Sequence, residues 1–174
     1  MPDLDLLILA RLLHVVAGTF WSGSAILLAG FLLPAVKAAG SAGAPVMRQL
    51  TAVRKLPEIL LATAAVAIAS GAYLYWIASG ALQATWLYSW SGSVYTFGAL
   101  AALTAFMVGI GINIPSANRM GALMAKLHAS GEQPTTEQSR MLSRLALRLV
   151  RGNRAVAVLL IAATAAMAVA RYLP

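Results

Sequence analysis

The chain has 174 residues, of which 60% are hydrophobic and only 10% are charged, and its mean hydropathy is +0.80. A soluble domain carries roughly 25% charged residues, so this composition excludes an ordinary soluble enzyme and indicates a membrane protein. The chain has no cysteine, which excludes disulfides, cysteine-bound zinc, iron–sulfur clusters and covalently attached c-type haem.

Four apolar segments fill most of the chain. A transmembrane helix needs about 20 mainly apolar residues, and we predict such helices over about 6–34, 57–77, 94–114 and 155–173. The predicted fold is all-α, a four-transmembrane-helix bundle integral to a membrane, with residues 1–174 forming a single transmembrane domain. No residues remain for a separate soluble domain, so any ligand would lie among the helices or at their ends.

The first predicted helix contains a histidine. Ionisable side chains inside a membrane span are costly and are therefore functional candidates. Helical steps of three or four residues place His14, Gly18, Trp21 and Ser22 on one stripe. Two interpretations follow. His14 ligates a haem iron, with Trp21 packed on the porphyrin and Gly18 allowing its close approach, or His14 is partly hydrated and hydrogen-bonds a neighbouring helix.

The second predicted helix begins at Pro57, whose missing N–H costs nothing in a first turn, and Glu58 complements the positive end of the helix dipole. The third ends before Pro115. The connection between these two helices is uncharged and rich in aromatic residues, which is typical of a membrane–water interface. The aromatic residues of this region are Tyr73, Tyr75, Trp76, Trp86, Tyr88 and Trp90.

The segment before the fourth predicted helix is also expected to be helical. Thr135 and Gln138 have the spacing of a capping box, which predicts an amphipathic cytoplasmic helix over about 136–152. Arginines recur along one face of it, at Arg140, Arg144, Arg148 and Arg151. Either this stripe binds anionic lipid or an acidic partner, or the fourth helix simply begins early and carries the charges that set orientation.

The basic residues predict the orientation. All Lys and Arg residues except Arg11 and Arg171 lie in the connections between helices 1 and 2 and between helices 3 and 4. The positive-inside rule puts segments 37–55 and 115–153 in the cytoplasm and both termini outside. The small format favours a bacterial inner (cytoplasmic) membrane. Because topology accounts for the net charge of +8, we expect membrane lipids, and no nucleic acid, as partners.

A resemblance appears in the first helix. The pattern His14-x3-Gly18-x2-Trp21-x-Gly23, followed by Leu33-Pro34-Ala35, resembles that of copper-resistance-D-like membrane proteins. It is also similar to related small four-helix families, including the HemJ-type protoporphyrinogen oxidases. The resemblance to these families extends to residues 54–57 before the second helix, to residues 70–75 at its end, and to Asn153. It therefore covers most of the chain in the order of its helices. It implies a metal or haem role for His14.

The chain departs from two-histidine haem proteins, because it has no second histidine within a predicted span. His128 lies in the cytoplasmic segment, roughly a bilayer's thickness from His14. A haem b on His14 would take Met167 as its sixth ligand, with Arg11 and Arg171 holding the propionates. A five-coordinate haem on His14, or a haem at a dimer interface, fits equally well.

Three functions are therefore open. The first is a haem-b-binding membrane protein for electron transfer or a small redox reaction, with quinone as a possible partner. The second is a non-catalytic accessory or assembly subunit, whose small-residue faces pack against membrane-protein partners or a second copy; these faces hold Gly18, Ser22, Ala25, Gly98, Ala101 and Ala105. The third is a copper-handling membrane protein, although copper sites need several Met, His or Cys ligands. The sequence identifies no catalytic residue.

Overall fold

The computed structural model describes residues 3–131 and 133–174, with Met1, Pro2 and Glu132 outside the described residues. Helices hold 89% of the residues, and the described part of the chain contains no strand. Four helical segments within it are long and apolar enough to cross a membrane. The predictions of an all-α fold and of four long apolar helices are confirmed.

The four segments differ in length. The first has 35 residues and joins α1 (Leu4–Leu27), the π-helical turn η1 (Leu28–Leu32) and α2 (Leu33–Ala38). The second is α4 (Leu56–Ala78), with 23 residues. The third has 41 residues and joins α6 (Trp90–Val108), the π-helical turn η4 (Gly109–Asn113) and α7 (Ile114–Ser130). The fourth is α8 (Thr136–Ala170), with 35 residues.

Short helical elements make the connections. The first and second segments are joined by η2 (Gly40–Ala42), α3 (Gly43–Arg48) and η3 (Gln49–Val53). The small helix α5 (Ala84–Leu87) lies between α4 and α6. About 20 residues cross a bilayer, so α4 with 23 residues is close to that length, whereas the other three segments, with 35 to 41 residues, are much longer.

Two prolines lie inside long segments, although we predicted that the first and third helices end next to them. Proline lacks an N–H, and its ring clashes with the carbonyl group four residues back. In both segments a π-helical turn comes just before the proline, η1 before Pro34 and η4 before Pro115. The wider turn shifts the hydrogen-bond pattern, and the chain stays helical to Ala38 and Ser130.

The start of α8 is as predicted. The backbone N–H of Gln138 donates to the hydroxyl oxygen of Thr135 over 3.3 Å, and the N–H of Thr135 donates to the side-chain oxygen of Gln138 over 2.8 Å. This pair is a capping box. From there α8 runs to Ala170 without a break, so the amphipathic helix and the fourth apolar helix that we predicted form one continuous element.

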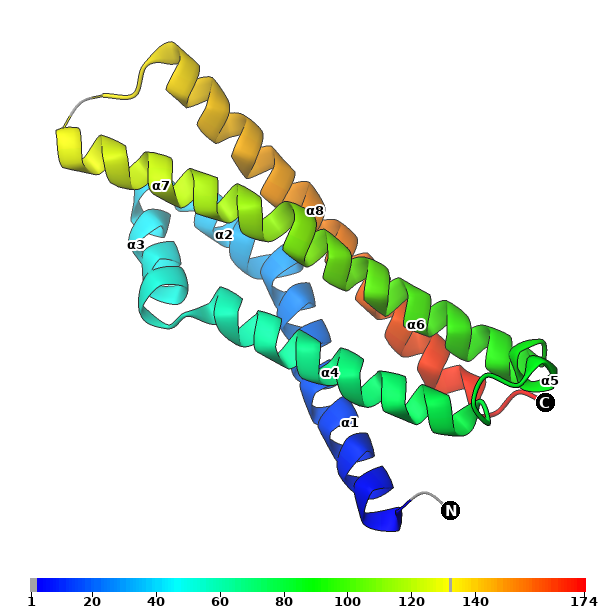
Figure 1. The fold of residues 1–174 in the computed structure, drawn as a ribbon. Coiled ribbons are helices and arrows are strands. Elements are labelled where there is room, and N and C mark those ends of the chain that lie inside the picture. Colours follow the sequence, from blue (N-terminus) through cyan, green and yellow to red (C-terminus); the bar gives the residue numbers. More distant parts are fainter. Residues whose placement is uncertain (1–2, 132) are drawn as a thin grey trace.

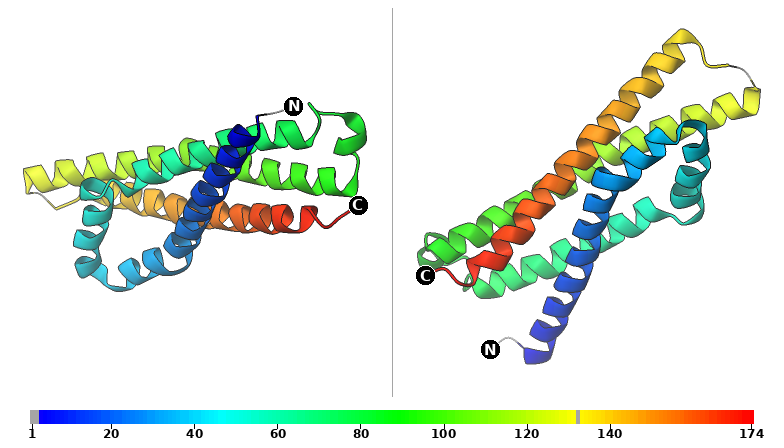
Figure 2. Two further views of the ribbon diagram at one scale, coloured as in Figure 1. Left: turned by 90° about the horizontal axis from the view of Figure 1, so that it is seen from below. Right: turned by 180° about the vertical axis from the view of Figure 1, so that it is seen from behind.

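The helices pack in two pairs. α1 packs mainly against α4 and α6 mainly against α8, while α1 also contacts α8. The end of α4, the start of α6 and the end of α8 meet at one end of the bundle, and the N-terminal end of α1 lies apart from them (Figure 1). We call this the aromatic end, after Tyr75, Trp86 and Tyr95. The opposite end, which holds α7 and the start of α8 (Figure 2), is called the arginine end.

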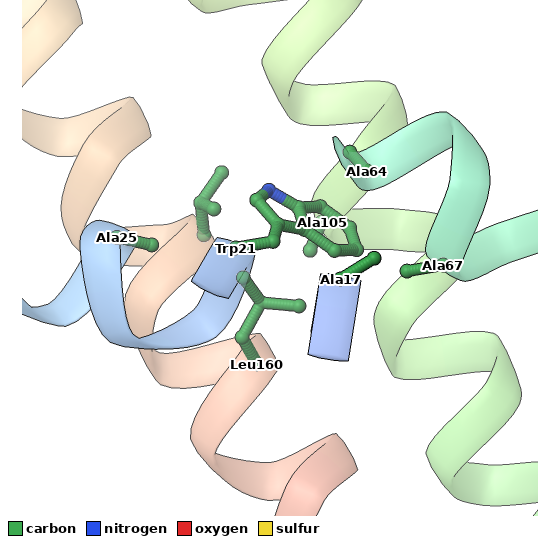
Figure 3. Packing of buried hydrophobic residues seen from close by; sticks show 8 residues of the cluster. Ala17, Trp21, Ala25, Ala64, Ala67, Ala105 and Leu160 are labelled. Atoms are coloured by element: carbon green, nitrogen blue, oxygen red, sulfur yellow. The ribbon is translucent and has the colours of Figure 1, made fainter. Parts of the chain in front are cut away.

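The core between the helices is built mainly of alanine around one large side chain, Trp21. Trp21 is 8% exposed and packs edge-to-face on Phe106, with 6.4 Å between ring centroids and 87° between ring planes. Small residues let helix backbones approach closely. The cluster comprises Ala17, Trp21 and Ala25 from α1, Ala64 and Ala67 from α4, Ala105 from α6, and Val156 and Leu160 from α8 (Figure 3).

The outer surface is rich in large apolar side chains. Phe31 is 67% exposed, Val158 65% and Phe97 59%, and many Leu, Ile and Val residues are similarly open. Small residues inside and large apolar residues outside reverse the usual arrangement of a protein in water, which buries its large apolar groups. This exterior requires an apolar environment or an extensive apolar partner.

α6–η4 and α8 approach each other closely at two positions. Near the arginine end, a Cβ atom at Gly152 would collide with Oδ1 of Asn113. That oxygen is buried and has no hydrogen-bond partner in the described part of the chain. Nearer the aromatic end, a Cβ atom at Gly98 would lie 3.1 Å from Cγ of Met167. Glycine therefore sets the distance between these helices at both ends of their contact.

Candidate functional site

His14 of α1 forms a hydrogen bond with the backbone of α4. Its Nδ1 lies 2.8 Å from the carbonyl oxygen of Ala67, and the imidazole is half-buried. A carbonyl oxygen can only accept, so Nδ1 is the donor, and in a neutral imidazole the lone pair is then on Nε2. Metal-ligating histidines commonly donate one ring N–H to a carbonyl in this way, which fixes the tautomer and the ring orientation.

Gly71 makes room for the His14 ring one helical turn after Ala67. A Cβ atom at position 71 would lie 2.7 Å from Cε1 and 2.9 Å from Nδ1 of His14. Cβ atoms in real structures essentially never come so close, so any larger residue must displace the imidazole or separate α1 from α4. Sequence reasoning placed Gly71 only within the family resemblance and missed this contact. The small-x3-small spacing of Ala67 and Gly71 is the signal that could have found it.

The other predicted residues on the first helix lie in different surroundings. Trp21 is buried in the core, so its ring contacts the chain's own side chains. A Cβ atom at Gly18 would meet no atom within 4 Å, so Gly18 borders open space instead of a packed helix. Gly18 thus leaves space beside the stripe that carries His14, whereas Trp21 mainly holds the helices together.

Met167, Arg11 and Arg171 do not contact His14 in any interaction that the structure shows. Met167 is turned toward Gly98 of α6, while His14 packs on α4. Arg171 follows the end of α8, and its guanidinium lies 4.8 Å from the ring centroid of Tyr172. Arg11 is exposed on the first half of α1, whose N-terminal end is apart from the chain's C-terminus (Figure 1). Their roles toward a haem remain predictions.

Few side chains of the described residues could bind a metal ion. Within residues 3–131 and 133–174, no group of three or more His, Cys, Asp and Glu side chains could hold a metal. His128 lies in α7, toward the arginine end. A porphyrin itself supplies four nitrogen ligands, so one imidazole is enough to anchor it, whereas copper needs several side chains of the protein.

The small-residue face of α6 is already covered. Gly98, Ala101 and Ala105 are buried inside the chain, and Ala105 has no exposed surface. Ala25 is also in the core. These residues therefore offer no outward face to a partner, and the accessory-subunit interpretation depends on Gly18 and Ser22.

The aromatic end divides into packed and exposed residues. The hydroxyl groups of Tyr75 and Thr96 are 2.6 Å apart and join α4 to α6. Trp86 packs edge-to-face on Tyr75, with centroids 5.3 Å apart, and stacks on Tyr95 at 6.1 Å. Tyr88, by contrast, is 89% exposed. The packed residues join the end of α4 to the start of α6, and Tyr75 lies one helical turn beyond Gly71.

No protein-family model, curated protein or solved structure matches the chain. What supports a role for His14 is thus its own geometry: a half-buried imidazole held by the Ala67 carbonyl, next to a glycine that gives the ring its place.

Proposed function

We propose that this chain is an integral membrane protein that binds haem b through Nε2 of His14 and serves electron transfer or a small redox reaction. The observation that carries the proposal is the 2.8 Å hydrogen bond from Nδ1 of His14 to the carbonyl of Ala67. In the neutral ring, this hydrogen bond leaves the lone pair on Nε2, and that nitrogen is then able to bind iron.

Membrane insertion is supported by the exterior of the bundle. Its exposed side chains are large and apolar, and no charged residue lies between Glu58 and Arg119. Removing apolar surface from water gains roughly 25 cal/mol per Å², so lipid is the favourable environment for such a surface. The arginine end would face the cytoplasm of a bacterium, with the aromatic end and both termini on the outer side of the inner membrane.

The redox role follows from what a bound haem supplies, which is a reversible one-electron couple. The residues of the chain would hold it: His14 would bind the iron, and Gly18 would leave open space beside it. Met167 is a proposed second ligand, and Arg11 and Arg171 are proposed partners of the propionates. A quinone dissolved in the bilayer is a proposed electron partner.

The absorption spectrum of detergent-purified protein tests this function. We expect a Soret band and α and β bands that sharpen on reduction. A colourless protein that co-purifies with a larger membrane complex would instead favour the accessory subunit. Stoichiometric copper without haem would favour the copper-handling protein.

A further inference from the structure

At the arginine end, a hollow of about 430 Å³ lies between α6–η4 and α8. One part of its wall is basic and carries Arg144, Arg148 and Arg151. These arginines are four and three residues apart, so they lie on one face of α8, across about 10 Å of helix. All three are exposed.

The rest of the wall is apolar. Val108 and Ile112 line the hollow from α6 and η4, and Ala155 lines it from α8. The third helical segment carries no charged side chain before Arg119. The hollow therefore runs from a zone of guanidinium groups into a zone of purely apolar side chains.

Among residues 3–131 and 133–174, the arginines of this hollow have no carboxylate partner. In the described part of the chain no acidic oxygen lies within 4 Å of their nitrogens. Glu137 lines a second hollow of about 470 Å³ with Arg140 and Arg144, one to two turns nearer the start of α8. Arg148 and Arg151 line only the first hollow, whose lining residues include no Asp or Glu. This face therefore carries positive charge that an external anion can neutralise.

We propose that the first hollow is a site for an anionic phospholipid, whose phosphate pairs with Arg144, Arg148 and Arg151 and whose acyl chain lies on Val108, Ile112 and Ala155. Arginine binds phosphate through paired, charge-assisted hydrogen bonds, and basic residues at a membrane surface attract anionic lipid. Free phosphate would use only the basic wall, whereas a lipid uses both walls. The site depends on the membrane insertion in the proposed function, but it does not depend on haem.

Native mass spectrometry of the full chain with phosphatidylglycerol tests the site, with phosphatidylcholine as the uncharged comparison. The triple variant Arg144→Gln, Arg148→Gln, Arg151→Gln is expected to lower the affinity for phosphatidylglycerol by at least about tenfold. The matched control Arg54→Gln, Arg119→Gln, Lys126→Gln removes the same charge from exposed positions outside the hollow, and it is expected to change the affinity less than about twofold. Ala155→Phe, which fills the apolar part, should also weaken lipid binding with all charges kept.

Three results would overturn the lipid site. The first is an equal loss of phosphatidylglycerol affinity in the two triple variants, and the second is equal binding of phosphatidylcholine and phosphatidylglycerol. The third is displacement of phosphatidylglycerol by millimolar inorganic phosphate, which would indicate a site for a soluble anion. A Soret band recorded on the same samples keeps the two proposals apart. If the unmodified protein shows an intact Soret band but no preference for phosphatidylglycerol, only the lipid site is contradicted. Extraction of the unmodified protein by alkaline carbonate would contradict the membrane insertion on which both proposals rest.

Discussion

Replacing His14 by alanine is expected to abolish haem binding, whereas replacing His128 by alanine leaves it unchanged. These are the only two histidines of the chain, so each variant is a matched control for the other. His14 offers Nε2 as a ligand while Ala67 holds Nδ1. His128 lies on α7, away from the contact between α1 and α4. Loss of the imidazole would remove the side chain that would hold the iron.

The measurement is the ratio of Soret to protein absorbance after purification of each variant. An unchanged ratio in His14→Ala would exclude His14 as the ligand. Loss of the band in His128→Ala alone would move the site to the arginine end. Addition of imidazole to His14→Ala provides a further check, because the free base can occupy the place of the missing ring and restore the band if the pocket is otherwise intact.

Replacing Gly71 by leucine is expected to disrupt both the α1–α4 contact and haem binding. Its Cβ atom alone would lie 2.7 Å from the His14 ring, so the ring must turn away from Ala67 or the helices must separate. Overpacking of this kind costs about 1–3 kcal/mol. The expected results are a lower midpoint of thermal unfolding in detergent and a weakened or shifted Soret band.

Gly23→Leu is the control for this prediction. Gly23 is exposed on α1, and a Cβ atom there would meet no atom within 4 Å. Leucine also favours a helix over glycine by up to about 1 kcal/mol. This variant should therefore be as stable as the original protein or slightly more stable. If Gly71→Leu unfolded at the same temperature as Gly23→Leu and kept the full Soret band, the placement of His14 against α4 would be wrong.

The elements that local chemistry determines could be predicted from the sequence. Long apolar runs gave the four helices, and the spacing of Thr135 and Gln138 gave the start of α8. Pro57 and Glu58 lie in the first turn of α4, as expected. Each of these signals depends on residues within one or two turns of each other, where the periodicity and capping rules apply.

The ends of the first and third helices could not be predicted in the same way. Proline usually ends a helix, and we expected the first to end at Pro34 and the third just before Pro115. The π-helical turns η1 and η4 accommodate the two prolines, and the sequence offers no reliable sign of a π turn. The third segment thereby gains α7, which extends the arginine end.

The surroundings of the candidate site depend on tertiary packing, which one sequence does not determine. The helical stripe placed His14, Gly18 and Trp21 on one side of α1, but it could not show that Trp21 fills the core while His14 contacts Ala67. The contact between His14 and Gly71 joins residues far apart in the chain. The same is true of Met167, whose neighbour is Gly98.

The orientation of the helices in the bilayer underlies both proposed sites, and labelling of single cysteines tests it most directly. The chain has no cysteine of its own, so each variant carries one label site. Ala39, Thr85 and Ser139 are exposed, and each is replaced singly by cysteine. Ala39 follows α2, Thr85 lies in α5, and Ser139 lies in the first turn of α8, before its arginines. In intact cells an impermeant maleimide should label only Thr85→Cys, and the other two should react only after permeabilisation. Labelling of Ala39→Cys and Ser139→Cys from opposite sides of the membrane would contradict the shared arginine end and the placement of His14 toward the opposite side of the bilayer from His128.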